Sequence, residues 1–372
     1  MAHDVQDNLF VGGRISKNIH IALGWLTGLQ GCFSVISTIK ILSRISRENI
    51  DIIHLHNLHN CYINIPLLFH YIKKKKIPVV WTLHDCWAFT GHCAYFDMAN
   101  CDKWKSDCHK CPQYKKYPQT AVDHVRTMYK LKKKWFSGVD NLTIVTPSVW
   151  LSKCVEQSFL SGYERVAINN GINLSAFDSA ACKTEETDRL RGKKVVLGVA
   201  HDWDARKGLD VFIELEKMLP QDYQIILVGT NEKIDSSLPP DIISIHRTRN
   251  VQKLAELYTL ADVFVNPTRE DVLGLVNIEA LACGTPVVSF DSGGSPECFD
   301  GTCGVVVPKN DIGKLKEEIE LVCTKRPYSA EACRTFASRL SKEEMCTNYI
   351  HLYERILHCG NESTVSKSAQ MY

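Results

Sequence analysis

The sequence predicts an α/β fold of two domains, each with a parallel β-sheet covered by helices on both faces. Short runs rich in Val and Ile, bounded by Gly, Pro, Asn or Asp, alternate with helical stretches along the 372 residues. This alternation is typical of parallel sheets. The length exceeds one average domain of roughly 150 residues, and an acidic, polar stretch at residues 175–192 is the expected linker.

The strands fall into two sets. Four are expected before the linker, at residues 51–56, 78–83, 142–146 and 166–169. Five are expected after it, at residues 194–199, 224–228, 242–245, 263–265 and 286–290. We therefore expect two Rossmann-like domains at residues 1–175 and 176–342, a helix at 343–359 that packs back on the first domain, and a polar tail at 360–372.

Composition excludes some classes of protein. The chain has 44 Lys and Arg against 42 Asp and Glu, and 45% of its residues are hydrophobic. It is therefore neither a disordered protein nor a nucleic-acid binder that works through net charge. The 16 cysteines come without a signal peptide, so we expect a reducing, cytoplasmic compartment and mostly free thiols.

Polar residues follow several of the predicted strands. Ligands of open parallel sheets bind beyond the carboxyl ends of the strands, so these residues are the candidates for a site. They are His84 after the strand at 78–83; His201, Arg206, Lys207 and Gly208 after 194–199; and Glu270, Asp271, Gly274 and Glu279 after 263–265.

The segment at residues 266–286 is the most informative. The start of its helix, at Gly274, Leu275 and Val276, has backbone N–H groups that could receive a diphosphate. Asp271 and Glu279 are separated by seven residues, so a carboxylate before the helix could bind sugar hydroxyls and one inside it a ribose. The alternative is that Asp271 caps the helix and Glu279 lies on a solvated face. The spacing alone does not decide between them.

This segment resembles the retaining GT-B glycosyltransferases of the GT4-like (group 1) family, and the likeness extends over nearly the whole chain. In that family an acid, seven residues and a Glu precede Ala and a Gly-Thr-Pro-Val-Val run, which Glu279, Ala280 and residues 284–288 match. The first acid is usually Glu. Here Asp271 holds that position and Glu270 lies beside it, so the resemblance assigns Glu279 and leaves the two others as alternatives.

The resemblance also implies roles for three cationic or titratable residues. Lys207, in the turn Arg206-Lys207-Gly208, aligns with a lysine that neutralises the nucleotide pyrophosphate, and His201 stands where the family has an arginine. His84 aligns with a histidine that faces the transferred sugar. The structural alternatives are an exposed lysine in a loop and a histidine that only satisfies the core.

A cysteine-rich run at residues 84–112 resembles a narrower subgroup that includes the colanic-acid-type exopolysaccharide transferases. Cys93, Cys101, Cys108 and Cys111 are candidate ligands of a structural zinc, since they end in a C-x-x-C pair. Four free thiols are the alternative, and disulfides rank last. No cofactor is expected for catalysis, because no Asp-x-Asp motif follows a strand.

Two basic clusters, at residues 73–76 and 130–135, are either solvated faces or contacts to an anionic membrane surface, with Trp135 and Phe136 at the interface. Residues 19–42 are apolar but carry His20, Gln30 and Lys40. They are therefore expected to form a buried or interfacial helix and not a membrane span.

The start of the chain departs from the family. No convincing strand precedes residue 51, so the first strand, the glycine-rich loop and the next βα element are expected to be missing, through a late-assigned start codon or a truncation. In the family that loop helps to bind the acceptor and the donor phosphate.

Together these features predict a cytoplasmic enzyme, peripheral on the inner face of the membrane, whose two domains close over a UDP- or GDP-sugar. It would transfer the sugar, with retention, to a glycan or polyprenyl-linked acceptor in the synthesis of a bacterial surface polysaccharide; no nucleic-acid partner is expected. The alternatives are an inactive nucleotide-sugar-binding remnant and a GT-B nucleotide-sugar epimerase.

Overall fold

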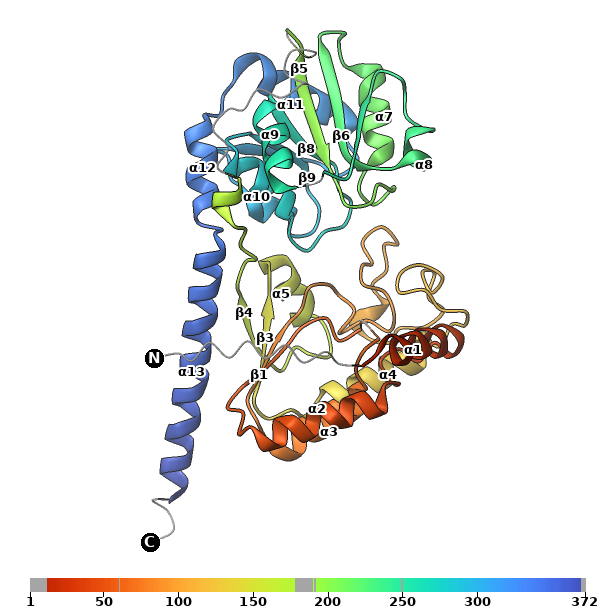
Figure 1. Cartoon of the computed structure of the whole chain (residues 1–372), viewed down its shortest axis with the longest axis vertical. Helices are drawn as coiled ribbons and strands as arrows, with labels where there is room; N and C mark the ends of the chain where they lie inside the picture. Colours follow the sequence, from red (N-terminus) through yellow and green to blue (C-terminus); the bar gives the residue numbers. More distant parts are fainter. Residues whose placement is uncertain (1–11, 60, 178–189, 191, 249, 369–372) are drawn as a thin grey trace. The chain divides into compact units, whose positions relative to one another are not determined.

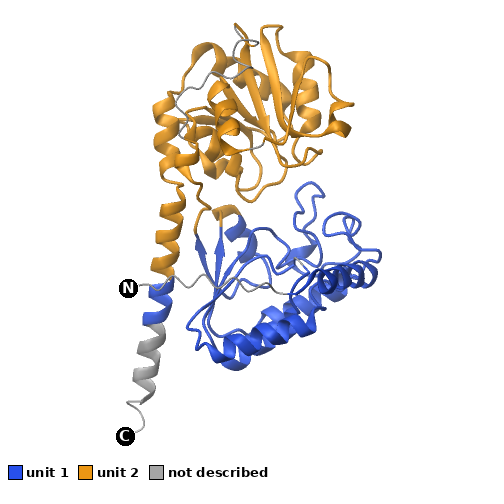
Figure 2. Cartoon of the chain, in the orientation of Figure 1, with its two compact units in different colours: residues 1–146, 151–167, 353–372 blue, residues 147–150, 168–352 orange. Residues whose placement is uncertain are grey.

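The computed structural model describes residues 12–59, 61–177, 190, 192–248 and 250–368, with side chains up to His358. The chain divides into two compact units (Figure 2). Unit 1 consists of residues 1–146, 151–167 and 353–372, and unit 2 of residues 147–150 and 168–352. The sequence placed the boundary at residue 175, whereas the contacts divide the chain after Ala167. Most of the expected linker lies outside the described residues.

Unit 1 is built on a four-stranded parallel sheet with the order β1-β2-β3-β4. Figure 1 labels β1, β3 and β4 of this sheet. Its strands are β1 (Ile53–Leu55), β2 (Val79–Thr82), β3 (Leu142–Thr146) and β4 (Glu164–Ala167). Its helices are α1 (Arg14–Thr27), α2 (Val35–Arg47), α3 (Ile65–Lys75), the short η1 (Lys103–Lys105), α4 (Val125–Phe136) and α5 (Val149–Glu156), whose first two residues belong to unit 2.

An aromatic cluster joins the sheet of unit 1 to two helices. Trp81 of β2 lies 4.7 Å from the ring of Phe136 of α4, and Phe136 lies 4.7 Å from Phe69 of α3. All three side chains are almost completely buried. Such packing contributes more than its buried area alone, because the rings meet at favourable angles.

The basic cluster at residues 130–135 is not a uniform solvated face. Lys132 is completely buried, and its Nζ donates to the carbonyl oxygens of Trp87 (2.7 Å) and Thr90 (3.1 Å). Burial lowers the pKa of Lys132 to about 7. Phe136 is also buried, so the expectation that it meets a membrane is wrong. Through Lys132, helix α4 instead holds the segment that follows β2 in place.

Unit 2 has a six-stranded parallel sheet with the order β10-β9-β8-β5-β6-β7. Its strands are β5 (Lys194–Val199), β6 (Tyr223–Thr230), β7 (Ile243–His246), β8 (Val263–Asn266), β9 (Val287–Phe290) and β10 (Gly304–Val307). Its helices are η2 (Leu174–Ala176), α7 (Leu209–Met218), α8 (Glu232–Asp235), α9 (Val251–Leu260), α10 (Leu275–Ala282), η3 (Ser295–Cys298), α11 (Ile312–Lys325) and α12 (Ala330–Ser338).

Apolar clusters cover both faces of this sheet, which explains why its strands are mainly apolar. Leu197 of β5 packs in one cluster with Tyr258 of α9. Its neighbour Val196 packs in the opposite cluster with Phe212 of α7. The nine predicted strands are all present, with ends that differ by no more than two residues, but the valine run of β10 was missed.

Helix α13 (Lys342–Ser368) begins in unit 2 and ends in unit 1. Within unit 1, Tyr353 Oη lies 2.6 Å from Nδ1 of His54, and Arg355 pairs with Glu164 at 2.7 Å. The helix extends to Ser368, where the sequence predicted a tail from residue 360. No helix in the described part of the chain is long and apolar enough to cross a membrane.

Glu297 of η3 joins two segments of unit 2 that are distant in the sequence, so its substitution tests a contact that stabilises the fold. Within unit 2 its carboxylate accepts hydrogen bonds from the N–H groups of Val149 and Trp150, each at 2.7 Å. Because bonds to a carboxylate are stronger than neutral ones, Glu297→Ala should lower the free energy of unfolding by about 1–3 kcal/mol. Glu317→Ala, on the exposed side of α11, is the control in urea denaturation. Equal losses in the two variants would contradict the role of Glu297.

Candidate functional site

A buried hydrogen-bond network fixes the start of α10 at the carboxyl edge of the sheet. Asn266 at the end of β8 donates to Oδ1 of Asn277 (2.8 Å), and Asn277 Nδ2 donates to Oγ of Ser295 (2.9 Å). All three side chains are buried. The helix therefore starts at a defined position in unit 2, immediately after the loop that carries Asp271.

The predicted anion cradle lies at this helix start. Gly274 is the N-cap residue, and α10 begins with Leu275 and Val276. Gly274 also faces Asn277, whose Nδ2 would lie 2.7 Å from a Cβ on that glycine. The N–H of Leu275 donates to the carbonyl oxygen of Leu273 (3.1 Å), so one of the expected amides is already engaged.

Lys207 and Asp271 meet beside this helix start. Lys207 Nζ lies 2.7 Å from Oδ2 of Asp271, and their side chains are only 21% and 13% exposed. Gly208 allows the approach of the two loops, because its φ is +79° and a Cβ there would lie 2.5 Å from the carbonyl oxygen of Pro267. The loops that follow β5 and β8 thus place a cation and a carboxylate side by side.

The other residues predicted to bind the nucleotide-sugar donor are not part of the Lys207–Asp271 pair. His201 is 79% exposed and lies 3.9 Å from the carboxylate of Asp202, so it does not join Lys207. The side chain of Arg206 donates to the backbone oxygen of Glu270 at 3.4 Å, and Glu270 is buried. Of the two alternative acids, Asp271 is the one whose carboxylate pairs with Lys207.

Glu279 lies one turn into α10 and is held by a residue that the sequence did not indicate. The hydroxyl of Tyr258, in α9, donates to Oε2 of Glu279 at 2.9 Å. Burial raises the pKa of Glu279 to about 7, and the hydrogen bond opposes this shift. Glu279 is therefore not a residue of a solvated face. No local spacing links residues 21 positions apart, so Tyr258 could not be found from the sequence.

His84 belongs to a group of histidines at the carboxyl edge of the sheet in unit 1. Its Nε2 lies 2.9 Å from Nδ1 of His56, which follows β1. His54, two residues before His56, has its Nε2 at 2.8 Å from Oγ1 of Thr82 and its Nδ1 at 2.6 Å from the hydroxyl of Tyr353. Burial, followed by the neighbouring histidines, lowers the pKa of His84 to about 4, so the ring is neutral at neutral pH.

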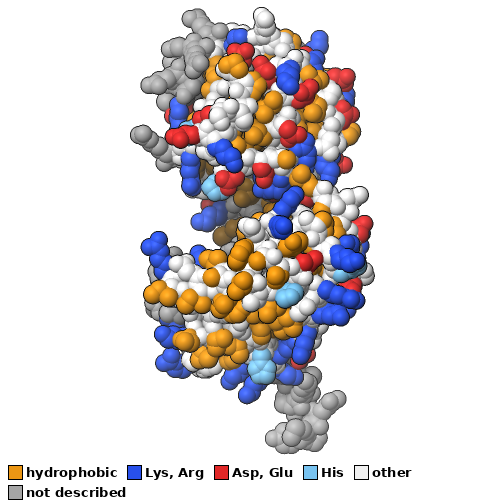
Figure 3. All heavy atoms as spheres, turned by 90° about the vertical axis from the view of Figure 1, so that its right-hand side faces the viewer, with side chains coloured by type: hydrophobic (Ala, Val, Ile, Leu, Met, Phe, Trp, Pro, Cys, Tyr) orange, Lys and Arg blue, Asp and Glu red, His pale blue; other side chains and the backbone are white. Residues whose placement is uncertain are grey.

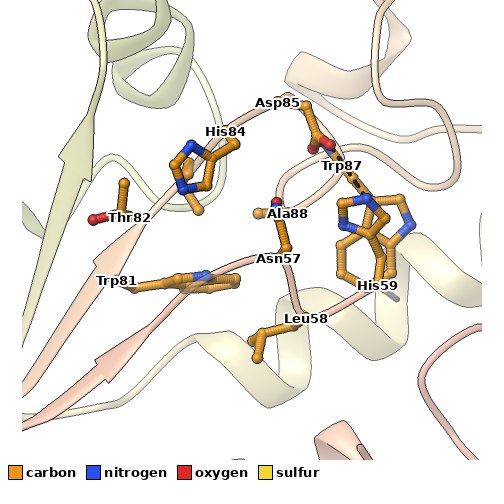
Figure 4. Close-up of a pocket in the computed structure, with 10 residues that line it drawn as sticks. Asn57, Leu58, His59, Trp81, Thr82, His84, Asp85, Trp87 and Ala88 are labelled. Atoms are coloured by element: carbon orange, nitrogen blue, oxygen red, sulfur yellow. Dashed lines mark hydrogen bonds and ion pairs between the residues drawn. The ribbon is translucent and has the colours of Figure 1, made fainter. Parts of the chain in front are cut away.

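Asp85 and His59 complete the lining of a small cavity around His84 (Figure 4). The carboxylate of Asp85 lies 3.3 Å from Nε2 of His59 and accepts a hydrogen bond from the N–H of Trp87 (2.8 Å). Burial raises the pKa of Asp85 and lowers that of His59. His56 and His59 were not among the predicted site residues, because His56 was assigned to the end of the predicted strand at 51–56, whereas β1 ends at Leu55.

The four cysteines predicted to hold zinc share one small cavity with His92 and His109. The N–H groups of Gly91 and Gln113 donate to the sulfurs of Cys108 and Cys111. The hydrogen bond between Cys93 and Cys111 lowers the pKa of Cys111 to about 7 and raises that of Cys93. Across the described residues, however, no three His, Cys, Asp or Glu side chains are placed to hold a metal ion. A zinc at Cys93, Cys101, Cys108 and Cys111 stays a prediction.

Comparisons with known proteins agree with this fold. The chain is 25% identical, over 79% of its length and 74% of the relative's, to a putative colanic acid biosynthesis glycosyl transferase, WcaC, of Escherichia coli. Among solved structures, it is similar to a sucrose-phosphate synthase of Thermosynechococcus elongatus, with a TM-score of 0.64, 18% identity and coverage of 87% and 79% of the two chains. It is also similar to Anabaena Alr3699/HepE in complex with UDP-glucose, with a TM-score of 0.58, 14% identity and coverage of 88% and 82%.

Two family models match the two halves of the chain. Residues 16–175 match the model of glycosyltransferase family 4, and residues 193–325 match that of the glycosyl transferases group 1. The first match includes His84, and the second includes Lys207, Asp271 and Glu279. The protein is a glycosyltransferase with the GT-B fold, and it belongs to the GT4-like, group 1 family.

Proposed function

We propose that this enzyme transfers a sugar from a nucleotide-sugar, a UDP- or GDP-sugar, to a growing bacterial surface polysaccharide, with retention of configuration. The observation that carries the proposal is the arrangement in unit 2, where the Lys207–Asp271 pair precedes a helix that carries the buried Glu279. Similar proteins support it: one is named as a putative colanic acid biosynthesis glycosyl transferase, and one structural neighbour was solved with UDP-glucose.

The proposed donor site follows from charge and hydrogen bonding. The diphosphate lies against the start of α10 and takes Lys207 as its counter-ion, because negative charge grows on the leaving group as the sugar departs. Asp271, released from Lys207, and Glu270 are the candidates that position the sugar. Glu279 accepts hydrogen bonds from the ribose hydroxyls, and Tyr258 keeps its carboxylate oriented.

The roles in unit 1 belong to the same proposal. His84, neutral and held by His56, positions the transferred sugar or the acceptor hydroxyl through its Nδ1. The acceptor is a glycan, carried on a lipid such as a polyprenyl diphosphate, and the enzyme works in the cytoplasm at the membrane surface. Protein groups perform the work of a divalent cation in this scheme, and a zinc at the four cysteines would serve only to order their segment.

The first test is a panel of UDP- and GDP-sugars, measured for binding and for transfer. Glu279→Ala should weaken binding of the accepted donor and reduce transfer by about a hundredfold or more, with an unchanged circular dichroism spectrum. Glu256→Ala, on the neighbouring α9, is the control. A folded, fully active Glu279→Ala enzyme would refute the assignment, and donor binding by the wild type without transfer to any glycan would favour the inactive remnant.

The raised pKa of Glu279 predicts that donor affinity depends on pH. Ribose hydroxyls need the ionised carboxylate as acceptor, so a protein whose Glu279 has a pKa of about 7 should bind UDP-glucose up to about tenfold more weakly at pH 6 than at pH 8. UDP-glucose suits this titration because its diphosphate diester does not ionise in that range. Tyr258→Phe removes the hydrogen bond that favours the carboxylate, so the midpoint should move to higher pH. Tyr328→Phe, in the same unit, should leave the midpoint in place; the idea fails if both variants behave alike.

His56 should act as a positioning residue for His84. His56→Ala frees Nε2 of His84 and lets its tautomer vary, so kcat should fall by about tenfold or more while the KM for the donor changes little. His56→Asn keeps a polar group near the position of Nδ1 and should restore part of the loss. His246→Ala, at an exposed pair with Asp235 in unit 2, is the control. Wild-type kcat in His56→Ala, or no recovery in His56→Asn, would argue against this role.

A further inference from the structure

Helix α1 turns its apolar side away from the rest of unit 1. Ile15, Ile19 and Leu26 lie on one side of the helix and are 77%, 54% and 58% exposed. The buried positions are His20 and Gly24. A helix of a globular domain normally buries its apolar side, so α1 leaves exposed a side that would usually be covered.

Helix α2 continues the same apolar surface. Val35, Ile36 and Ile39 are 46%, 73% and 53% exposed, whereas Ser37 and Thr38 are buried. The two helices are joined through polar groups, with His20 Nδ1 at 2.7 Å from Oγ of Ser34. We name the surface that remains the α1–α2 face, formed by Ile15, Ile19, Leu23, Trp25, Leu26, Val35, Ile36 and Ile39.

The charged residues of α1 and α2 are all basic. Residues 12–47 contain five basic residues and no Asp or Glu; these are Arg14, Lys17, Lys40, Arg44 and Arg47. The first acid that follows, Glu48, pairs with Arg44. Three further lysines end the neighbouring helix α3, at residues 73–75. Figure 3 shows hydrophobic side chains gathered on unit 1, with Lys and Arg side chains around them.

We propose that the α1–α2 face docks unit 1 onto an anionic lipid bilayer. Its apolar side chains would enter the boundary between headgroups and acyl chains, Trp25 would lie at that boundary, and the basic residues would contact anionic headgroups. A protein partner would need acidic groups complementary to this rim, whereas an anionic bilayer provides negative charge on every side of the face. Neither helix can cross the membrane, so the contact is interfacial.

This inference deepens the proposed function, since it names the surface by which an enzyme with a lipid-linked acceptor reaches the membrane. It does not depend on the transfer reaction. It also differs from the surface suggested by the sequence, in which Lys132 and the adjacent Phe136 are buried. The lysines at residues 73–75, from the other predicted basic cluster, belong to the rim of the α1–α2 face.

The test is sedimentation of the full chain with sucrose-loaded vesicles, made either of phosphatidylglycerol and phosphatidylcholine or of phosphatidylcholine alone. The wild type should bind the anionic vesicles, and its affinity for neutral vesicles should be lower by about tenfold or more. Ile19→Glu should weaken binding to anionic vesicles by about tenfold or more, because it buries a charge in the boundary region. Ile350→Glu is the matched control, since Ile350 is 53% exposed on α13.

The charges are tested separately. Lys40→Glu should weaken binding to anionic vesicles and leave the weak binding to neutral vesicles unchanged, whereas Lys217→Glu, at an exposed position of α7, should change neither. Circular dichroism confirms that each variant is folded. UDP-glucose binding, measured on the same proteins, tests the proposed donor site independently. If the wild type does not bind UDP-glucose, the proposed donor is wrong, but the vesicle result still tests the α1–α2 face.

Two results would overturn the proposal. One is wild-type binding that is absent, or unchanged in Ile19→Glu. The other is a stable dimer in analytical ultracentrifugation that Ile19→Glu dissociates, without any binding to vesicles, which would make the α1–α2 face an interface between two copies of the chain.

Discussion

The proposed donor site depends on the buried amide of Asn277. It ties the start of α10 to Asn266 at the end of β8 and to Ser295 beyond β9. A buried amide without these partners would cost roughly 1–3 kcal/mol, so the network specifies one position for the helix. That position determines where Gly274 presents the helix start, and it places Glu279 within reach of Tyr258. The loop with Asp271 is then positioned at the same edge as Lys207.

Parallel topology explains why the sequence predicted so much of the architecture. Strands buried on both faces are continuous apolar runs, and these were located with small errors at their ends. The residues after those runs included Lys207 and Asp271, which form an ion pair, and Glu279, which lies in the helix that follows Asp271. β10 was missed because its apolar run is only three valines long, between Gly304 and Pro308, and so short a run does not distinguish a strand from a loop.

The features that could not be predicted from the sequence depend on contacts between residues that are far apart along the chain. Tyr258 comes from a helix with no motif, and its link to Glu279 exists only once α9 and α10 are packed together. Lys132 reads as one lysine in a basic run, and only the fold shows that its ammonium lies under Trp87. The same limit applies to α1, because its apolar side is evident from the sequence but its outward direction is not.

The most direct test of the account is a crystal structure of the protein with a bound nucleotide-sugar. We predict that the diphosphate lies at the start of α10 within hydrogen-bond distance of Lys207 Nζ, that the Lys207–Asp271 pair opens, and that the ribose hydroxyls contact Glu279. A diphosphate bound elsewhere, with Glu279 still contacting only Tyr258, would contradict the central claim that this helix start is the donor site.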